Sequence, residues 1–546
     1  MNTASIYDSA MAGLQYAQAG MVATSQNVTG SNVAGYVRRN PNLQISTLSP
    51  SSIQAGGTAF SVEGFTRNFN ALLQNQLLSQ QSKTSFTATL TQAVSTLDAM
   101  LVDPSASIAT ALGNFFNAAG SLANDPTNQA YQQALTGAAN QVGDRIRGMA
   151  DLVGTLELDA RQGMADVLNQ ANSLAPQLAD VNVRIKDATV PGVSYPSGDL
   201  LDERDRITSK LQELIGGTTI INEDGTASYS VDGVQLVDRV RSNRFSLASG
   251  ASTITANAGL PGSLYLAIPA FPVPATQLNL STADPLERES INLQINNKTQ
   301  VSPLKSTTFK DGQAGAYALL LQNFVPTLQK SLNLLAVELV NKVNTIPTGT
   351  SPSPTIAPIF GFKSTTGVAD STSIDATGAP ASVIALLNNS SISYADLLDA
   401  NSTKFNTSAL QDARNAFDLW IKSGSACSVD ARNFKSVAVF APSQFAGKMT
   451  SESATSLEAL RSSFTEPVTF ITSSVANTIA TWNNQHKTNE TMSQVLSDQK
   501  NAISGVNLDE EAANLVKYQQ LYNAASKLIQ TNRQMFDTLL AMLASN

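Results

Sequence analysis

The densest group of ionisable side chains lies in the stretch LLDERDRI, residues 200–207. Three carboxylates, Asp202, Glu203 and Asp205, are close enough in sequence to act as an acid–base pair or as oxygen ligands of a metal ion. Two arginines, Arg204 and Arg206, alternate with them. Alternating charges are typical of a helix face held by ion pairs, so we predict a structural segment rather than a catalytic or metal site.

Few other residues could take part in catalysis or bind a metal ion or phosphate. A Ser-His-Asp triad would need His486, the only histidine, which lies in the polar stretch TWNNQHKTNE and is predicted to be a solvated helix residue. The only cysteine, Cys427, is interpreted as a small apolar residue. These single residues exclude an HExxH or cysteine-based zinc site and an internal disulfide framework. The stretch APSQFAGKMT departs from a phosphate-binding loop at Pro442 and Met449. We therefore predict no enzyme activity and no cofactor.

Composition narrows the class of protein. The 546 residues carry a net charge of −8 and no run of lysines and arginines, which argues against binding to nucleic acid. The most apolar run, LNLLAVELVNKV, contains Glu338 and Lys342 and is too short to cross a bilayer, so no membrane insertion is expected. Asp8 is the only charged residue before Val37, so a secretory signal with a basic start is missing. A cytoplasmic protein and export without a cleaved signal are the two interpretations.

Both ends of the chain carry apolar residues seven positions apart, the spacing of helices that pack along other helices. The C-terminal stripe consists of Leu508, Leu515, Tyr522, Ile529 and Phe536. The N-terminal stripe consists of Tyr7, Leu14, Met21 and Val28, with the small residues Ala10, Ala17 and Thr24 between them. Neither stripe buries enough surface to offset the ordering of its own backbone. We predict that the terminal helices pair with each other; separate docking on a globular body is the alternative.

Between the ends, helical and β-rich regions alternate. Helical periodicity covers 71–216, 312–346 and 452–504, whereas Asp-Gly turns mark hairpins from residue 217 onward. The predicted fold class is multidomain α+β, in which a discontinuous helical stem (a terminal coiled coil plus a helical bundle) carries inserted central β-rich domains. The predicted domains are 1–70 with 505–546, 71–216 with 312–346 and 452–504, the β-rich 217–311, and 347–451 as an outer mixed α/β insertion.

Residues 25–40, SQNVTGSNVAGYVRRN, resemble the N-terminal signature of bacterial flagellar axial proteins, S-x-N-I-A-N-x-N-T-x-G-Y. The matching residues are Ser25, Asn27, Val28, Asn32, Gly35 and Tyr36, with Arg38 at the following basic position. Gly30, Val33 and Ala34 depart from the usual Asn, Thr and Pro. Residues 103–135, the stretch GDLLDERDRI at 198–207 and the C-terminal segment 504–543 are similar to the FlgK-type hook-associated proteins of the hook–filament junction.

This resemblance implies a structural subunit of the bacterial flagellum, exported by the flagellar type III system and located outside the cell. It implies self-assembly into a ring, through the two heptad stripes, between the hook protein and the third hook-associated protein. It also implies a dedicated export chaperone, for which Tyr522, Ile529 and Phe536 are the predicted anchors. Another flagellar axial protein, or a secreted coiled-coil translocator or adhesin, would be the alternative.

Overall fold

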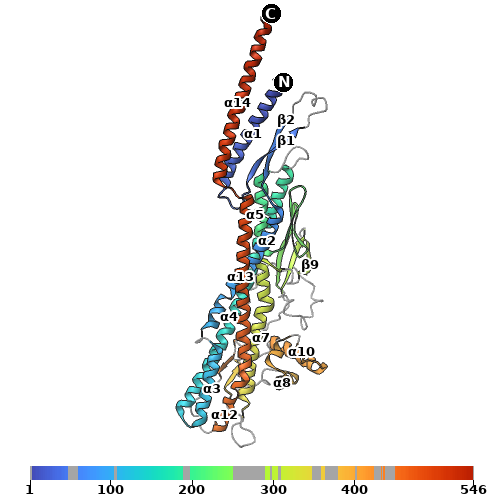
Figure 1. The fold of residues 1–546 in the computed structure, drawn as a ribbon. Helices are drawn as coiled ribbons and strands as arrows, with labels where there is room; N and C mark the ends of the chain where they lie inside the picture. Colours follow the sequence, from blue (N-terminus) through green and yellow to red (C-terminus); the bar gives the residue numbers. More distant parts are fainter. Residues whose placement is uncertain are drawn as a thin grey trace.

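The computed structural model shows an elongated molecule with both chain ends at the same tip (Figure 1). It describes residues 3–46, 59–103, 107–188, 197–249, 289–295, 298–304, 309–346, 358–362, 379–399, 402–423, 432, 434–436 and 449–544. The predicted fold class is confirmed, because a helical stem built from separate parts of the chain carries small antiparallel sheets. Cys427 lies outside the described residues.

The tip consists of two antiparallel helices, α1 (Thr3–Gly30) and α14 (Leu508–Ala544), which lie side by side (Figure 1). Their direction follows from three contacts, which pair Gly13 with Ala525, Gly20 with Tyr518, and Asn27 with Glu511. Both helices lack the long apolar face that a core requires, so each covers the other. The two ends of one chain therefore form the terminal coiled coil.

Helices from distant parts of the sequence form the stem. They are α2 (Ala71–Val102), α3 (Ile108–Asn124), α4 (Gln129–Ala188), α5 (Gly198–Ile215), α6 (Gly312–Leu319), α7 (Val325–Asn344), α12 (Ser451–Ala459) and α13 (Arg461–Ser504). Side-chain oxygens of Asn70, Ser107, Ser197 and Thr450 cap the first turns of α2, α3, α5 and α12. A π-helical turn, Leu320–Phe324, joins α6 to α7 just before Pro326, whose missing N–H and bulky ring disturb regular α-helical bonding. None of the helices in the described ranges is long and apolar enough to span a membrane.

The stem has two hydrophobic cores. The larger core joins α2, α3, the first half of α4, α7 and α13, and includes the stacked rings of Phe116 and Phe464, 5.9 Å apart. The smaller core joins the second half of α4 and α5 to the sheet formed by residues 218–242, around Ile207, Leu211 and Tyr229. Because the 60-residue helix α4 contributes to both cores, it ties the two halves of the stem together.

The sheets are small and antiparallel. A hairpin of β1 (Arg39–Ser46) and β2 (Ala59–Arg67) follows α1. The β-rich region holds a sheet of β3 (Thr218–Ile221), β4 (Ala227–Val231), β5 (Val234–Asp238) and β6 (Arg241–Ser242), and another of β7 (Arg244–Ser249), β8 (Glu289–Ile295) and β9 (Lys298–Leu304). Gly225 and Gly233 adopt positive φ angles of 80° and 82°, at the two predicted Asp-Gly turns.

Asparagine side chains on the stem helices join helices to strands. Each amide accepts a hydrogen bond from the backbone N–H of one strand residue and donates one to the C=O of the same residue. The pairs are Asn172 with Phe245, Asn182 with Ala227, and Asn344 with Phe360, at distances of 2.7–3.2 Å. A side-chain amide thus replaces a neighbouring strand and satisfies backbone groups that burial would otherwise leave unpaired.

The described parts of 347–451, predicted as an inserted domain, share the larger core of the stem. They comprise α8 (Ala381–Leu387), α9 (Tyr394–Leu398), α10 (Ser408–Ser423) and the paired strands β10 (Phe360–Phe362) and β11 (Phe434–Ser436). The ring of Phe360 lies 5.4 Å from that of Phe115 in α3, and Lys330 of α7 forms an ion pair with Asp418 at 2.7 Å. This segment is therefore packed on the stem through the stem's own core.

Candidate functional site at the base of the terminal helices

The seam between α1 and α14 is made of small and polar residues. Ala10, Ala17, Thr24 and Asn27 of α1 are buried, as are Glu511, Tyr518 and Ala525 of α14. Gly20 allows the closest approach, because a Cβ atom at this position would lie 2.4 Å from the ring of Tyr518. On α1 the contact therefore runs through the small positions between the large heptad residues, and on α14 it runs through Glu511, Tyr518 and Ala525.

The larger heptad residues, predicted to pair with each other, lie mostly outside this seam. Tyr7, Val28, Leu508, Leu515 and Phe536 are exposed, with Phe536 at 55% and Val28 at 44%, whereas Leu14, Met21, Tyr522 and Ile529 are half-buried. The prediction that these stripes form the contact within the chain is thus wrong in its choice of face. Large side chains on both helices would hold the backbones too far apart for Tyr518 to pack on Gly20.

Tyr518 stabilises the middle of the seam. Its ring meets that of Tyr16 edge to face, with ring centres 5.7 Å apart. Burial, together with the neighbouring Tyr16 hydroxyl, raises the pKa of Tyr518 to about 12. The phenol is therefore neutral at physiological pH and adds no charge to the seam.

Asn27, a residue of the axial-protein motif, is the centre of a buried hydrogen-bond network. Its amide donates to the C=O of Arg39 and accepts from the N–H of Arg39, both at 2.9 Å. The amide also donates to the carboxylate of Glu511 at 3.1 Å and accepts from the Tyr36 hydroxyl at 2.9 Å. One side chain thus joins α1, the loop that follows it, the first residue of β1 and the first turns of α14.

Other residues of the motif shape the loop that returns to Asn27. Gly35 adopts a φ of +85°, which favours glycine, and Asn32 is exposed. The ring of Tyr36 packs directly on Gly30, where a Cβ atom would lie 2.5 Å from it. Gly30 departs from the asparagine typical of axial proteins, and the close approach of the ring accounts for glycine here.

Arg38 ties α14 to the end of α13. Its guanidinium forms ion pairs with Glu511 at 2.7 Å and with Glu510 at 2.9 Å, while its backbone N–H donates to the C=O of Ser504 at 3.0 Å. The two carboxylates lie in the first turn of α14, where their negative charge also interacts favourably with the positive end of the helix dipole.

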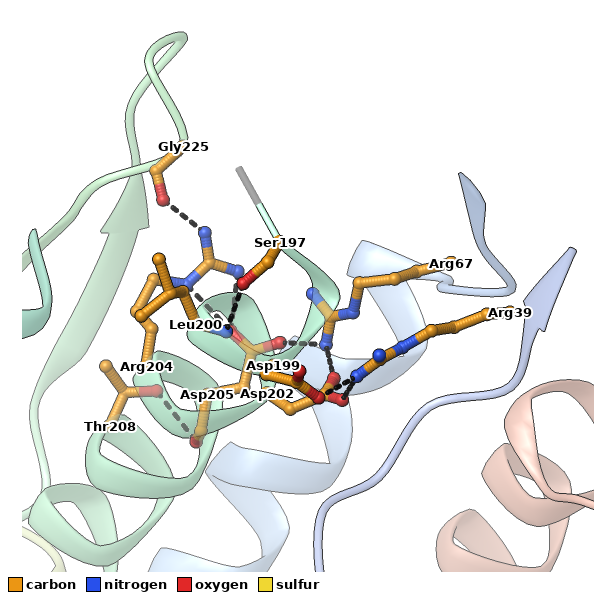
Figure 2. Close-up of polar contacts among 10 residues, drawn as sticks. All are labelled: Arg39, Arg67, Ser197, Asp199, Leu200, Asp202, Arg204, Asp205, Thr208 and Gly225. Carbon is orange, nitrogen blue, oxygen red and sulfur yellow. Dashed lines mark hydrogen bonds and ion pairs between the residues drawn. The ribbon is translucent and has the colours of Figure 1, made fainter. Parts of the chain in front are cut away.

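Below this network, six charged side chains form an unbroken alternating row (Figure 2). In order, they are Asp199, Arg39, Asp202, Arg67, Asp205 and Arg204, and neighbouring members lie 2.6–2.9 Å apart. The carboxylates and Arg204 belong to α5, whereas Arg39 and Arg67 come from β1 and β2. We call this row the charge row; it connects the stem to the terminal unit, which consists of α1, the β1–β2 hairpin and α14.

Burial and the neighbouring arginines shift the pKa of Asp202 in opposite directions. Burial raises the pKa of Asp202, whereas the guanidinium groups of Arg67 and Arg39 lower it. Lys500 of α13 faces the same carboxylates: burial lowers its pKa, and Asp205 and Asp202 act in the opposite direction. The cluster therefore depends on each carboxylate to compensate the cations packed around it.

The predicted ion-paired face of α5 is present, but it accounts for only some of the ion pairs that α5 makes. Arg206 pairs with Glu203 at 2.5 Å on the exposed side, and Arg204 pairs with Asp205. Asp202 instead pairs with Arg39 and Arg67, which sequence reasoning did not connect with this segment. Arg38 and Arg39 are the first basic residues in the chain. Two adjacent cations after a long stretch without any were the sequence feature that could have indicated acidic partners elsewhere.

The prediction that His486 is a solvated helix residue is wrong. It is half-buried between α13 and α2, and its Nδ1 lies 3.3 Å from the hydroxyl of Thr87. Nearby, Asn489 accepts a hydrogen bond from Gln80 at 3.0 Å. The histidine is therefore part of a polar contact between two stem helices rather than a solvated residue.

Comparisons with known proteins agree with this architecture. Residues 94–263 match a model of the flagellar hook-associated protein FlgK helical domain, and residues 499–542 match a model of the flagellar basal body rod FlgEFG protein C-terminal region. The chain is 25% identical to flagellar hook-associated protein 1 of Escherichia coli over 578 residues, covering 98% of this chain and 99% of that protein. The same identity and coverage hold over 583 residues for the protein of that name from Salmonella typhimurium. A solved flagellar hook junction protein FlgK from Burkholderia pseudomallei is 21% identical, with a TM-score of 0.41 over 53% of this chain and 47% of that chain.

The paired terminal helices and the rod-type C-terminal match define a flagellar axial protein. With the helical-domain match and the near full-length relatives, the chain is similar along nearly its whole length to the FlgK-type flagellar hook-associated proteins. It is a structural component of the flagellum.

Proposed function

We propose that this chain forms the junction between hook and filament, as a ring of subunits joined through their terminal helices. The observation that carries the proposal is the number of large apolar side chains that the α1–α14 pair leaves exposed. Its exposed large residues are Tyr7, Val22, Val28, Leu508, Leu515, Val516, Leu528, Met535, Phe536 and Leu540. Apolar surface gathered on one pair of helices is typical of a protein–protein contact, and neighbouring subunits would cover it.

The reach of α14 supports the same proposal. The register that sets Gly13 against Ala525 and Asn27 against Glu511 places Thr3 opposite Met535. Phe536 and Leu540 therefore extend past the described start of α1, and both are exposed. In the proposed ring this overhang would contact another axial subunit, with the hook protein on one side and the third hook-associated protein on the other. Export would follow the flagellar type III route without a cleaved signal.

Deletion of the gene tests the junction. We expect cells with hooks but without attached filaments, and we expect the intact gene to restore filaments and motility. The measurement is electron microscopy of isolated flagella together with a motility assay. Normal filaments in the deletion strain would contradict the proposal and favour a secreted coiled-coil translocator or adhesin.

We further propose that an export chaperone binds α14 before secretion, with Tyr522, Ile529 and Phe536 as anchors. Phe536 is exposed beyond α1, so it is available without opening the helix pair. Its replacement by aspartate should weaken the complex roughly tenfold to a hundredfold, the loss expected when a buried phenyl contact is removed. Isothermal titration with the cognate flagellar chaperone measures this affinity.

The matched control is Leu508→Asp, which places the same charge at an equally exposed residue at the other end of α14. We expect this variant to bind the chaperone with the affinity of the wild type. If removal of residues 505–546 leaves the affinity unchanged, the chaperone binds elsewhere.

A further inference from the structure

Two arginines face each other at the base of the β1–β2 hairpin. Arg39 and Arg67 are direct partners in the strand register, and their side chains are only 5% and 8% exposed. Like charges at opposed positions of an antiparallel pair repel each other, and burial removes the water that would screen them. The base of this hairpin is therefore unfavourable by itself.

Asp202 compensates this repulsion from outside the hairpin. Its carboxylate lies 2.9 Å from the guanidinium of Arg39 and 2.7 Å from that of Arg67, so it bridges the two cations (Figure 2). Asp199 and Asp205 stand one turn before and after it on α5, and each binds the same Nη2 atom of one arginine that Asp202 binds: Asp199 that of Arg39 and Asp205 that of Arg67. All the carboxylates in the charge row thus come from the stem.

The backbone of Arg39 is held by a different part of the chain. Asn27 of α1 binds its N–H and C=O, and the guanidinium lies 4.8 Å from the centre of the Tyr36 ring. Arg39 therefore binds α1 through its backbone and α5 through its side chain. None of the described side chains of α14 belongs to either hydrophobic core of the stem, whereas the charge row joins β1 and β2 directly to α5.

We propose that Asp202 is a positioning residue that makes closure of the hairpin base conditional on docking against α5. When its charge is present, the two arginines lie side by side and the terminal unit is held against the stem. When the charge is absent, the arginines repel each other and the hairpin base opens, while the stem and the α1–α14 pair stay folded. The proposal is independent of the role at the hook–filament junction.

Hydrogen exchange on the full-length chain tests the proposal. In Asp202→Asn, we expect the amides of Arg39–Ser46 and Ala59–Arg67 to exchange roughly tenfold faster or more, because two buried cations lose their shared partner. Exchange in α4 should remain that of the wild type. The matched control is Glu203→Gln, the same chemical change at the next residue, whose partner Arg206 lies on the exposed side of α5.

A triple variant separates repulsion from simple loss of contacts. Arg39→Gln and Arg67→Gln, added to Asp202→Asn, remove both cations, while Asp205 keeps Arg204 and Asp199 is 79% exposed to water. We expect this triple variant to recover most of the hairpin protection that the single variant loses. Wild-type exchange in Asp202→Asn, or exchange in the triple variant as fast as in the single variant, would overturn the proposal.

Discussion

Replacement of Asn27 by alanine is expected to open the terminal helix pair. The change leaves the buried N–H and C=O of Arg39, the Tyr36 hydroxyl and the Glu511 carboxylate without their shared partner. Each lost bond to a buried group costs about 1–3 kcal/mol, so the total is on the order of 3–5 kcal/mol even with partial relaxation. Trypsin should then cleave after Lys517 and Lys527 in α14 roughly a hundredfold faster or more, since cleavage follows the population of the open helix.

Asn172→Ala is the matched control for this prediction. Asn172 makes the same pair of bonds to one backbone residue, Phe245, but does so within the stem. Its loss should destabilise the packing of β7 on α4 and leave cleavage in α14 unchanged. Equal cleavage rates in Asn27→Ala and the wild type would show that Tyr518 and the small-residue seam hold the helices without this network.

Replacement of Phe360 by alanine is expected to destabilise the stem by about 3–5 kcal/mol, the usual cost of removing a buried phenyl ring. Phe360 is fully buried against Phe115 of α3, and its backbone is bound by Asn344 of α7. Denaturant unfolding measures the transition of the stem, with the far-ultraviolet circular dichroism of the helices as the signal.

The control for Phe360→Ala is Leu419→Ala, which removes an exposed apolar side chain of α10 in the same segment. Its effect should stay within about 0.5 kcal/mol. If Phe360→Ala leaves the unfolding transition of the stem unchanged, then 347–451 behaves as an independent insertion. If the transition shifts as expected, deletion of this segment would uncover the core of the stem.

Several features could be predicted from the sequence because they depend on local spacing. The turns of the β-rich region follow from the Asp-Gly pairs, whose glycines adopt the positive φ angles that such turns need. Heptad spacing at both ends is enough to predict that neither terminal helix is self-sufficient. Residues 25–36 identify the axial-protein loop, in which Gly35 needs its positive φ angle and Tyr36 returns to Asn27.

Tertiary structure alone decided which faces and charges meet. Heptad spacing does not distinguish the large positions from the small ones as the inner face; the approach of Tyr518 to Gly20 selects the small positions. Likewise, Asp202 has oppositely charged neighbours in sequence, yet it binds Arg39 and Arg67, which are more than one hundred residues away. A carboxylate pairs with the cation that its helix face is turned toward, and only the packing of the hairpin on α5 brings these arginines to that face.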